Sequence, residues 1–312
     1  MLNQIDYPAY PSTASAPDAR SSSRKKQKRL AIAPALALVV ALTAIGSACA
    51  SPKSKPNQIR YEYLSPKSAA HQAIYDQIKE GRPLEHLKEL LSPLRLPYPL
   101  TLKMAGCDGD INAWYHDEVI TVCYELLADV LKNAPTQDLP IGVSQADTII
   151  GPILDVFLHE TGHAVFSMLQ IPVLGREEDA ADQFSAYVML RLSKDEARRM
   201  VLGAAYQYNV QMPGPQVTLP IHSFSGEHSL PAQRAFNVLC MAYGADKKLF
   251  ADIVEKDFLP KSRAETCEFE YEDITFAMTK LISPHIDKRF AKKFHQVWAR
   301  TVIARRARFT RQ

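Results

Sequence analysis

The sequence lacks an excess of either charge, any internal repeat and any C-x-x-C pair of cysteines. Its 312 residues hold 37 Lys+Arg against 34 Asp+Glu. Six basic and two acidic side chains fall within residues 1–50, so the remainder carries a net charge of about −1. Because residues 51–312 are so close to neutral, the sequence gives no sign of a nucleic-acid partner. The absence of C-x-x-C pairs argues against zinc fingers.

Cysteine is also scarce, and no residue class dominates the composition. Five cysteines are too few for a small disulfide scaffold. Apolar residues make up 46% and charged residues 23% of the chain, close to the averages for globular proteins. These values exclude a disordered tail protein, a collagen-like fibre and a coiled-coil rod. The length fits one large domain or two ordinary ones.

One long uncharged stretch, residues 30–50, follows a basic cluster at residues 24–29. A positive segment, an apolar core and small residues at its end predict a secretory signal. Cleavage after Ala50, lipidation of Cys49 and an uncleaved membrane anchor are the three alternatives. Each places the basic residues 1–29 in a bacterial cytoplasm and the remainder outside, in the periplasm, in the medium or tethered to the membrane.

Four cysteines remain beyond this segment, and an even number in an exported chain predicts two disulfides. Pairing Cys107 with Cys123 closes a loop of about 16 residues, a gain of roughly 3 kcal/mol in the chain-entropy model. We therefore favour Cys107–Cys123 and Cys240–Cys267 over the other two connectivities and over four buried free thiols.

The hydrophobic pattern predicts strands early in the chain and helices after them, which favours an α+β fold. Residues 51–58 form a predicted linker, 59–285 the main domain and 286–312 a basic helix or tail. That last stretch holds nine basic residues and one acidic residue between apolar side chains. A packed helix with one solvated face is expected there, and contact with a membrane surface is the alternative. Strands are expected at 59–63, 100–104, 112–115 and 119–124, and helices at 66–81, 84–91, 125–134, 145–169, 177–192, 194–208, 231–243, 246–255 and 263–281.

The segment His159-Glu160-Thr161-Gly162-His163 lies within the longest helical pattern. Residues four apart share one face of a helix, so His159 and His163 can bind one zinc ion. Glu160 lies beside them as a candidate general base. Two surface histidines without a metal are the simpler interpretation of this segment alone.

The next predicted helix supplies Glu178 and Asp182, again four residues apart in an E-x-x-A-D pattern. Glu178 fits the third zinc ligand, and Asp182 fits the acceptor that orients a ligating imidazole. The alanines between them are small enough for two helices to approach closely. Glu177 and Asp179 are rival ligands, and a solvated acidic helix start is the interpretation without a metal.

HExxH followed by E-x-x-A-D resembles the gluzincin metallopeptidases. The longer run of residues 159–183 resembles more closely a bacterial family of putative metallopeptidases, domain of unknown function family 4344. The likeness covers roughly residues 59–281 and implies a small β-sheet with an edge strand, packed on a zinc-binding helical core. Further similar segments are Cys107, Asn112–Tyr115, Cys123–Leu126, His228–Arg234 and Arg263–Cys267.

This resemblance implies an exported zinc-dependent metallopeptidase with one Zn²⁺ per chain and a peptide or protein substrate. A zinc-activated water would attack the peptide carbonyl with Glu160 as general base. His228 is the candidate donor to the oxyanion, with Tyr187 and Tyr243 as rivals. A plain helix cap is the alternative role of His228.

Asn112, Ala113 and Trp114 resemble the edge strand that lines the cleft of thermolysin-like enzymes, where an extended peptide adds as a further strand. The alternative is an ordinary strand with Trp114 in the core. Rival functions are a catalytically silent zinc-containing binding domain and a zinc amidase acting on cell-wall peptides. Glu160 argues against the silent domain, because structural zinc needs no general base. The same ligands could hold iron(II) or cobalt.

Overall fold

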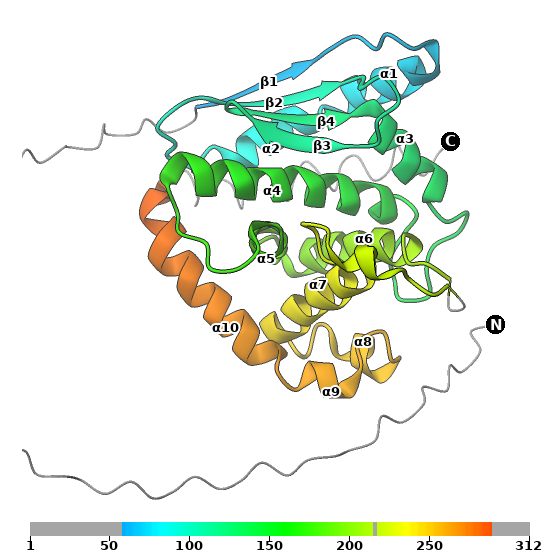
Figure 1. Cartoon of the computed structure of the whole chain (residues 1–312), viewed down its shortest axis with the longest axis vertical. Coiled ribbons are helices and arrows are strands. Elements are labelled where there is room, and N and C mark those ends of the chain that lie inside the picture. Colours follow the sequence, from blue (N-terminus) through cyan, green and yellow to red (C-terminus); the bar gives the residue numbers. More distant parts are fainter. Residues whose placement is uncertain (1–57, 215–216, 289–312) are drawn as a thin grey trace, which may run out of the picture. The chain divides into compact units, whose positions relative to one another are not determined.

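This computed structural model describes residues 58–214 and 217–288 (Figure 1). The predicted basic segment, the apolar stretch 30–50, nearly all of the linker and the basic stretch beyond Lys288 lie outside these residues. Within the described part of the chain, no helix is both long and apolar enough to cross a bilayer.

Four strands form one open sheet in the order β1-β2-β4-β3. Strands β1, β2 and β4 are parallel, and β3 runs antiparallel to β4 at one edge. Most apolar side chains of the two central strands are fully buried, as expected where both faces of a sheet are covered. They are Leu100, Leu102, Met104, Ile120, Val122 and Cys123. The expected edge strand is therefore confirmed. The bounds are β1 Ile59–Tyr63, β2 Leu100–Ala105, β3 Ala113–His116 and β4 Val119–Cys123.

The helices follow mostly after the strands, so the predicted α+β class is confirmed. Helix α2 packs on β1 and β2, while α4 contacts β3 and β4 and also α5 and α6 (Figure 1). Covered by the sheet and by two helices, α4 is apolar on most of its surface. The bounds are α1 Gln72–Gly81, α2 Pro83–Leu91, α3 Tyr124–Asn133, α4 Asp147–Leu169, α5 Glu177–Met189, α6 Lys194–Val210, α7 Pro231–Ala245, α8 Ala251–Glu255, α9 Lys261–Ala264 and α10 Cys267–Ala277.

The largest differences between the predicted helices and the structure occur in three of them. The helix expected from residue 66 starts with a 3₁₀ turn at Ala69–His71, because the Ser68 hydroxyl caps the amide of Ala70. The helix expected at 246–255 is reduced to α8. The helix expected at 263–281 is divided into α9 and α10 and ends in a π-helical turn at Met278–Ile282. Hydrophobic periodicity alone did not locate these breaks.

The second predicted disulfide, Cys240–Cys267, joins the middle of α7 to the first residue of α10 and is confirmed. Gly244 lies one turn further along α7, and a Cβ there would lie 2.1 Å from the carbonyl oxygen of Cys267. The absence of a side chain at Gly244 thus lets α7 and α10 approach to a distance that the disulfide then locks.

Glycine also sets the crossing of α4 and α6. A Cβ on Gly203 would lie 2.2 Å from the carbonyl oxygen of Asp147, a backbone atom that cannot turn away. We predict that Gly203→Ala lowers the free energy of unfolding by about 2–3 kcal/mol, despite the ~1 kcal/mol gain in helix propensity. The melting temperature should fall by roughly 5–10 °C in thermal denaturation. Gly214→Ala is the control, since a Cβ there meets nothing within 4 Å. Equal melting temperatures for the two variants would contradict the prediction.

Candidate metal centre

Helix α4 carries the HExxH residues into the interior. His159 is 4% and Glu160 8% exposed, while His163, one turn later, lies nearer the surface. The two imidazole rings lie 4.9 Å apart at their centroids, as their spacing of four residues predicts.

The chain then reverses, and α5 returns along α4. The turn begins at Gln170, in the left-handed region at φ 53°, and passes through Gly175 at φ 105°. Gly162 faces Ala181, and a Cβ on this glycine would lie only 3.1 Å from the Cα of Ala181. The small residues predicted on α5 thus permit the close approach. Its partner Gly162 was not singled out in the sequence, although it lies inside the HExxH motif.

The close packing brings Glu178 to the two histidines. Its Oε2 lies 3.0 Å from Nε2 of His159 and 3.4 Å from Nε2 of His163, and the two Nε2 atoms are 3.2 Å apart. These three atoms come from the three predicted ligands, and the structure groups them as a possible metal site.

The outer nitrogen of each imidazole has a carboxylate partner. Nδ1 of His159 lies 2.8 Å from Oδ1 of Asp182, and Nδ1 of His163 lies 2.8 Å from Oε1 of Glu177. When each Nδ1–H donates to its carboxylate, each Nε2 presents a lone pair to the other and to Glu178. Three converging lone pairs repel one another unless a proton or a metal cation lies between them. Two imidazoles and a carboxylate are donors that zinc prefers, so the residues fit a zinc ion.

The electrostatics of the group also favour a cation. Burial would lower the pKa of His159, but hydrogen bonds to Asp182 and Glu178 outweigh it and raise the pKa to about 9. Burial would raise the pKa of Glu178, yet hydrogen bonds from three histidines hold that pKa well below its usual range. A group of carboxylates that attracts a proton this strongly also attracts a divalent metal.

Glu160 lies beside this group without joining it. Burial raises the pKa of its carboxyl group, and this outweighs the lowering effect of His159 and His163. Among the described residues, no donor hydrogen-bonds to this carboxylate. The geometry therefore leaves Glu160 able to exchange a proton with a water molecule.

His228 reaches the same place from the loop before α7. Its Nε2 lies 2.7 Å from Oε2 of Glu178, and its ring stacks on that of His159 with centroids 5.7 Å apart. Its side chain is 54% exposed, so one side of the ring faces solvent. His228 does not cap α7, because the cap position is Leu230, whose amide donates to the side chain of Gln233. Of the rival donors, Tyr187 stacks on Tyr271 of α10.

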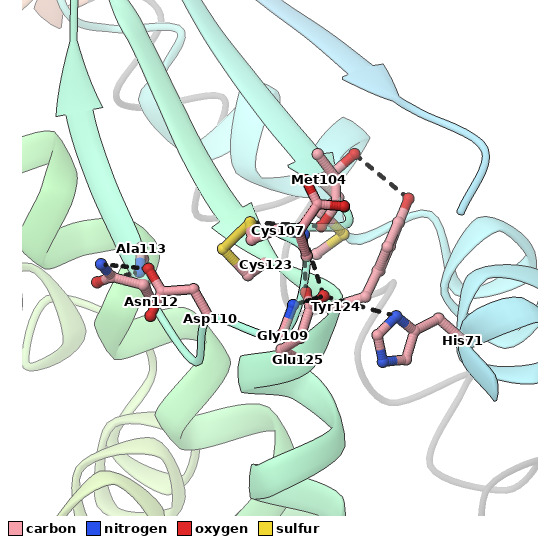
Figure 2. The surroundings of a disulfide bond; sticks show 12 residues. His71, Met104, Cys107, Gly109, Asp110, Asn112, Ala113, Cys123, Tyr124 and Glu125 are labelled. Atoms are coloured by element: carbon pink, nitrogen blue, oxygen red, sulfur yellow. Dashed lines mark hydrogen bonds and ion pairs between the residues drawn. A yellow bond between two sulfur atoms is a disulfide. The ribbon is translucent and has the colours of Figure 1, made fainter. Parts of the chain in front are cut away.

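The predicted cleft strand, residues 112–115, is shifted by one residue in the structure. Asn112 precedes β3, which begins at Ala113. Trp114 is 39% exposed, so it does not belong to the core. Oδ1 of Asn112 accepts a hydrogen bond from the amide of Ala113, and its Nδ2 donates to Asp110 (Figure 2).

A disulfide and a carboxylate both hold the loop between β2 and β3 in place. The predicted disulfide Cys107–Cys123 is confirmed and ties the loop to the end of β4. The carboxylate of Glu125 accepts hydrogen bonds from the backbone amides of Cys107 and Gly109 at 3.0–3.1 Å (Figure 2). We did not assign Glu125 a role from the sequence. The only signal was its place in the segment Cys123–Leu126.

Two imidazoles and a carboxylate from adjacent helices define a candidate metal centre on an α+β scaffold. Beside them lies Glu160, to which no described residue donates a hydrogen bond. Residues 63–282 match the model of the family DUF4344, described as putative metallopeptidase. The chain belongs to this family, and the resemblance seen in the sequence is confirmed. No curated protein and no solved structure matches the chain. The family description supports a peptidase and implies a metal.

Proposed function

We propose that the chain is an exported zinc-dependent metallopeptidase that hydrolyses peptide bonds. The observation that carries this proposal is the convergence of His159, His163 and Glu178 within 3.0–3.4 Å of one another. Membership of the family supports the reaction class. One zinc ion per chain is proposed, because the described residues supply one such group that a disulfide does not already occupy.

Zinc held by these three side chains would lower the pKa of a water in its open position towards about 7. Glu160 would take the proton of the attacking water and deliver it to the leaving amine. Its burial next to His159 and the absence of a described donor support this role. His228 would donate from Nε2 to the developing oxyanion. Its half-exposed ring beside Glu178 supports that assignment.

The substrate would be an extended peptide that pairs with β3 along the edge that no described strand covers. The amide of Cys123 donates to the carbonyl of Asn112, which makes these two residues a hydrogen-bonded pair of the antiparallel ladder. Because such pairs alternate, the peptide groups of Ala113 and Tyr115 point away from β4. The amide of Ala113 already donates to Oδ1 of Asn112, so an added strand would hydrogen-bond to the carbonyl of Ala113 and to the peptide groups of Tyr115. Asn112 and Trp114 would contact its side chains.

The proposed location is outside the cytoplasm. Disulfides persist in oxidising compartments, and the two pairs Cys107–Cys123 and Cys240–Cys267 support export. Residues 30–50 would direct it, either as a cleaved signal or as a membrane tether. The substrates would then be extracytoplasmic peptides or proteins.

The test is the zinc content and peptidase activity of the purified protein. We expect mass spectrometry to find about one zinc per chain. A library of unstructured peptides should be cleaved, and cleavage should stop with a chelator and return with zinc. A folded sample that binds no zinc when zinc is offered would contradict the metal site. Zinc binding with cleavage of cell-wall peptides alone would replace the peptidase by an amidase.

A further inference from the structure

One short segment at and before the start of α7 contacts α5 repeatedly. This segment is Gly226–Arg234, and it follows the first half of α5. Its partners are, in order, Arg176 for the carbonyls of Gly226 and Glu227, Glu178 for His228, Asp179 for Ser229 and Asp182 for Arg234. The metal-site helix α5 is thus held along one side by a single stretch of chain.

The last of these contacts, between Arg234 and Asp182, joins two opposite charges through two hydrogen bonds. Nε of Arg234 donates to Oδ2 of Asp182 at 2.8 Å, and Nη2 donates to Oδ1 at 2.6 Å. The same Oδ1 faces Nδ1 of His159 at 2.8 Å. A two-pronged guanidinium bond fixes both the position and the plane of a carboxylate. The orientation of Asp182, and through it that of His159, is therefore set from the side opposite the metal.

Arg234 is itself held by buried groups. Its guanidinium lies 4.5 Å from the ring centroid of Tyr208, and the Tyr208 hydroxyl donates to Asp155 at 2.6 Å. The other oxygen of Asp155 accepts from the hydroxyl of Ser185, also at 2.6 Å. Helices α4, α5, α6 and α7 each contribute to this chain of contacts. Such a fixed surround leaves the guanidinium little freedom to turn away from Asp182.

We propose that Arg234 is a positioning residue of the metal centre, which sets the affinity for zinc by fixing Asp182 against His159. The inference rests on the proposed zinc function. Carboxylates that orient a ligating imidazole commonly change metal affinity 10- to 100-fold when removed. Arg234 holds the carboxylate of Asp182, which in turn contacts the ligand His159. We expect its removal to lower zinc affinity by a similar factor, although Arg234 contacts neither the metal nor a ligand.

The first test is a double-mutant cycle on zinc affinity, measured by competition with a chromophoric chelator. Arg234→Met should weaken zinc binding about 10- to 100-fold, and Arg234→Lys by less, because lysine keeps the charge but not the two-pronged bond. In an Asp182→Ala background, Arg234→Met should cause no further loss, since its effect passes through Asp182. Equal losses in the two backgrounds, or affinity within threefold of the unaltered protein, would overturn the proposal.

The matched control is Arg198→Met. Arg198 makes the same kind of two-pronged bond to Asp252, at 3.0 and 2.8 Å, and lies 5.8 Å from the ring centroid of Phe250. It contacts no residue of the metal centre among its described partners. We expect zinc affinity to stay unchanged in this variant, which separates positioning from a general loss of stability.

A second test needs no metal. In the zinc-free protein, nitrogen-15 NMR should detect a slowly exchanging Nδ1–H of His159, hydrogen-bonded to Asp182. Arg234→Met should speed its exchange at least tenfold, while Arg198→Met should leave it unchanged. Persistence of the slow signal in Arg234→Met would overturn the proposal. If the unaltered protein bound no zinc, the proposed function would fail, yet this measurement would still decide the role of Arg234.

Discussion

Glu160→Gln should lower kcat/KM for peptide hydrolysis by about 10²–10⁴-fold while the zinc content stays at about one per chain. Glutamine keeps the size of the side chain but cannot take a proton from water. Glu160 is not among the three converging ligands, so its substitution should not release the zinc ion. Steady-state kinetics on a cleaved library peptide, beside metal analysis of the same samples, measure both quantities.

The control for this prediction is Glu62→Gln. Glu62 is an exposed residue of β1, at the sheet edge opposite β3, and its substitution should leave kcat/KM unchanged. Activity of Glu160→Gln within threefold of the unaltered protein would show that another group accepts the proton. Loss of zinc together with activity would instead assign Glu160 to the ligand set.

The centre of the site could be predicted from the sequence because it depends on helical spacing. His159 and His163 share a face of α4, and Glu178 and Asp182 share a face of α5, at any orientation of the two helices. Only the packing of α4 on α5 had to be assumed, and small residues indicated it. The two disulfides were predictable for a similar reason, since one short loop favoured one of three connectivities.

Contacts between distant segments could not be predicted in this way. Arg234 meets Asp182 across 52 residues, and Glu125 caps the amide of Cys107 across 18. Neither pairing leaves a periodic signal in the sequence. The order of the strands in the sheet could not be predicted for the same reason. The position of β2 between β1 and β4 depends on how the connecting segments fold.

Removal of the third ligand should have the largest effect on the metal. Glu178→Ala leaves two imidazoles, and zinc affinity should fall more than roughly 100-fold, beyond the effect of losing a hydrogen-bond partner. At 1,000 times its dissociation constant, zinc stabilises the folded protein by about 4 kcal/mol. Zinc should therefore raise the melting temperature of the unaltered protein by roughly 10 °C and that of Glu178→Ala hardly at all. Thermal denaturation with and without zinc measures this difference.

Glu177→Ala is the informative comparison, because its carboxylate lies one residue away and contacts the outer nitrogen of His163. It is 52% exposed, against 18% for Glu178. We expect zinc to bind Glu177→Ala about 10-fold more weakly but still to raise its melting temperature. Successive residues of a helix point about 100° apart. A reversed order of the two variants would therefore mean that α5 is rotated by about that angle when zinc is bound, and Asp182 could then no longer face His159.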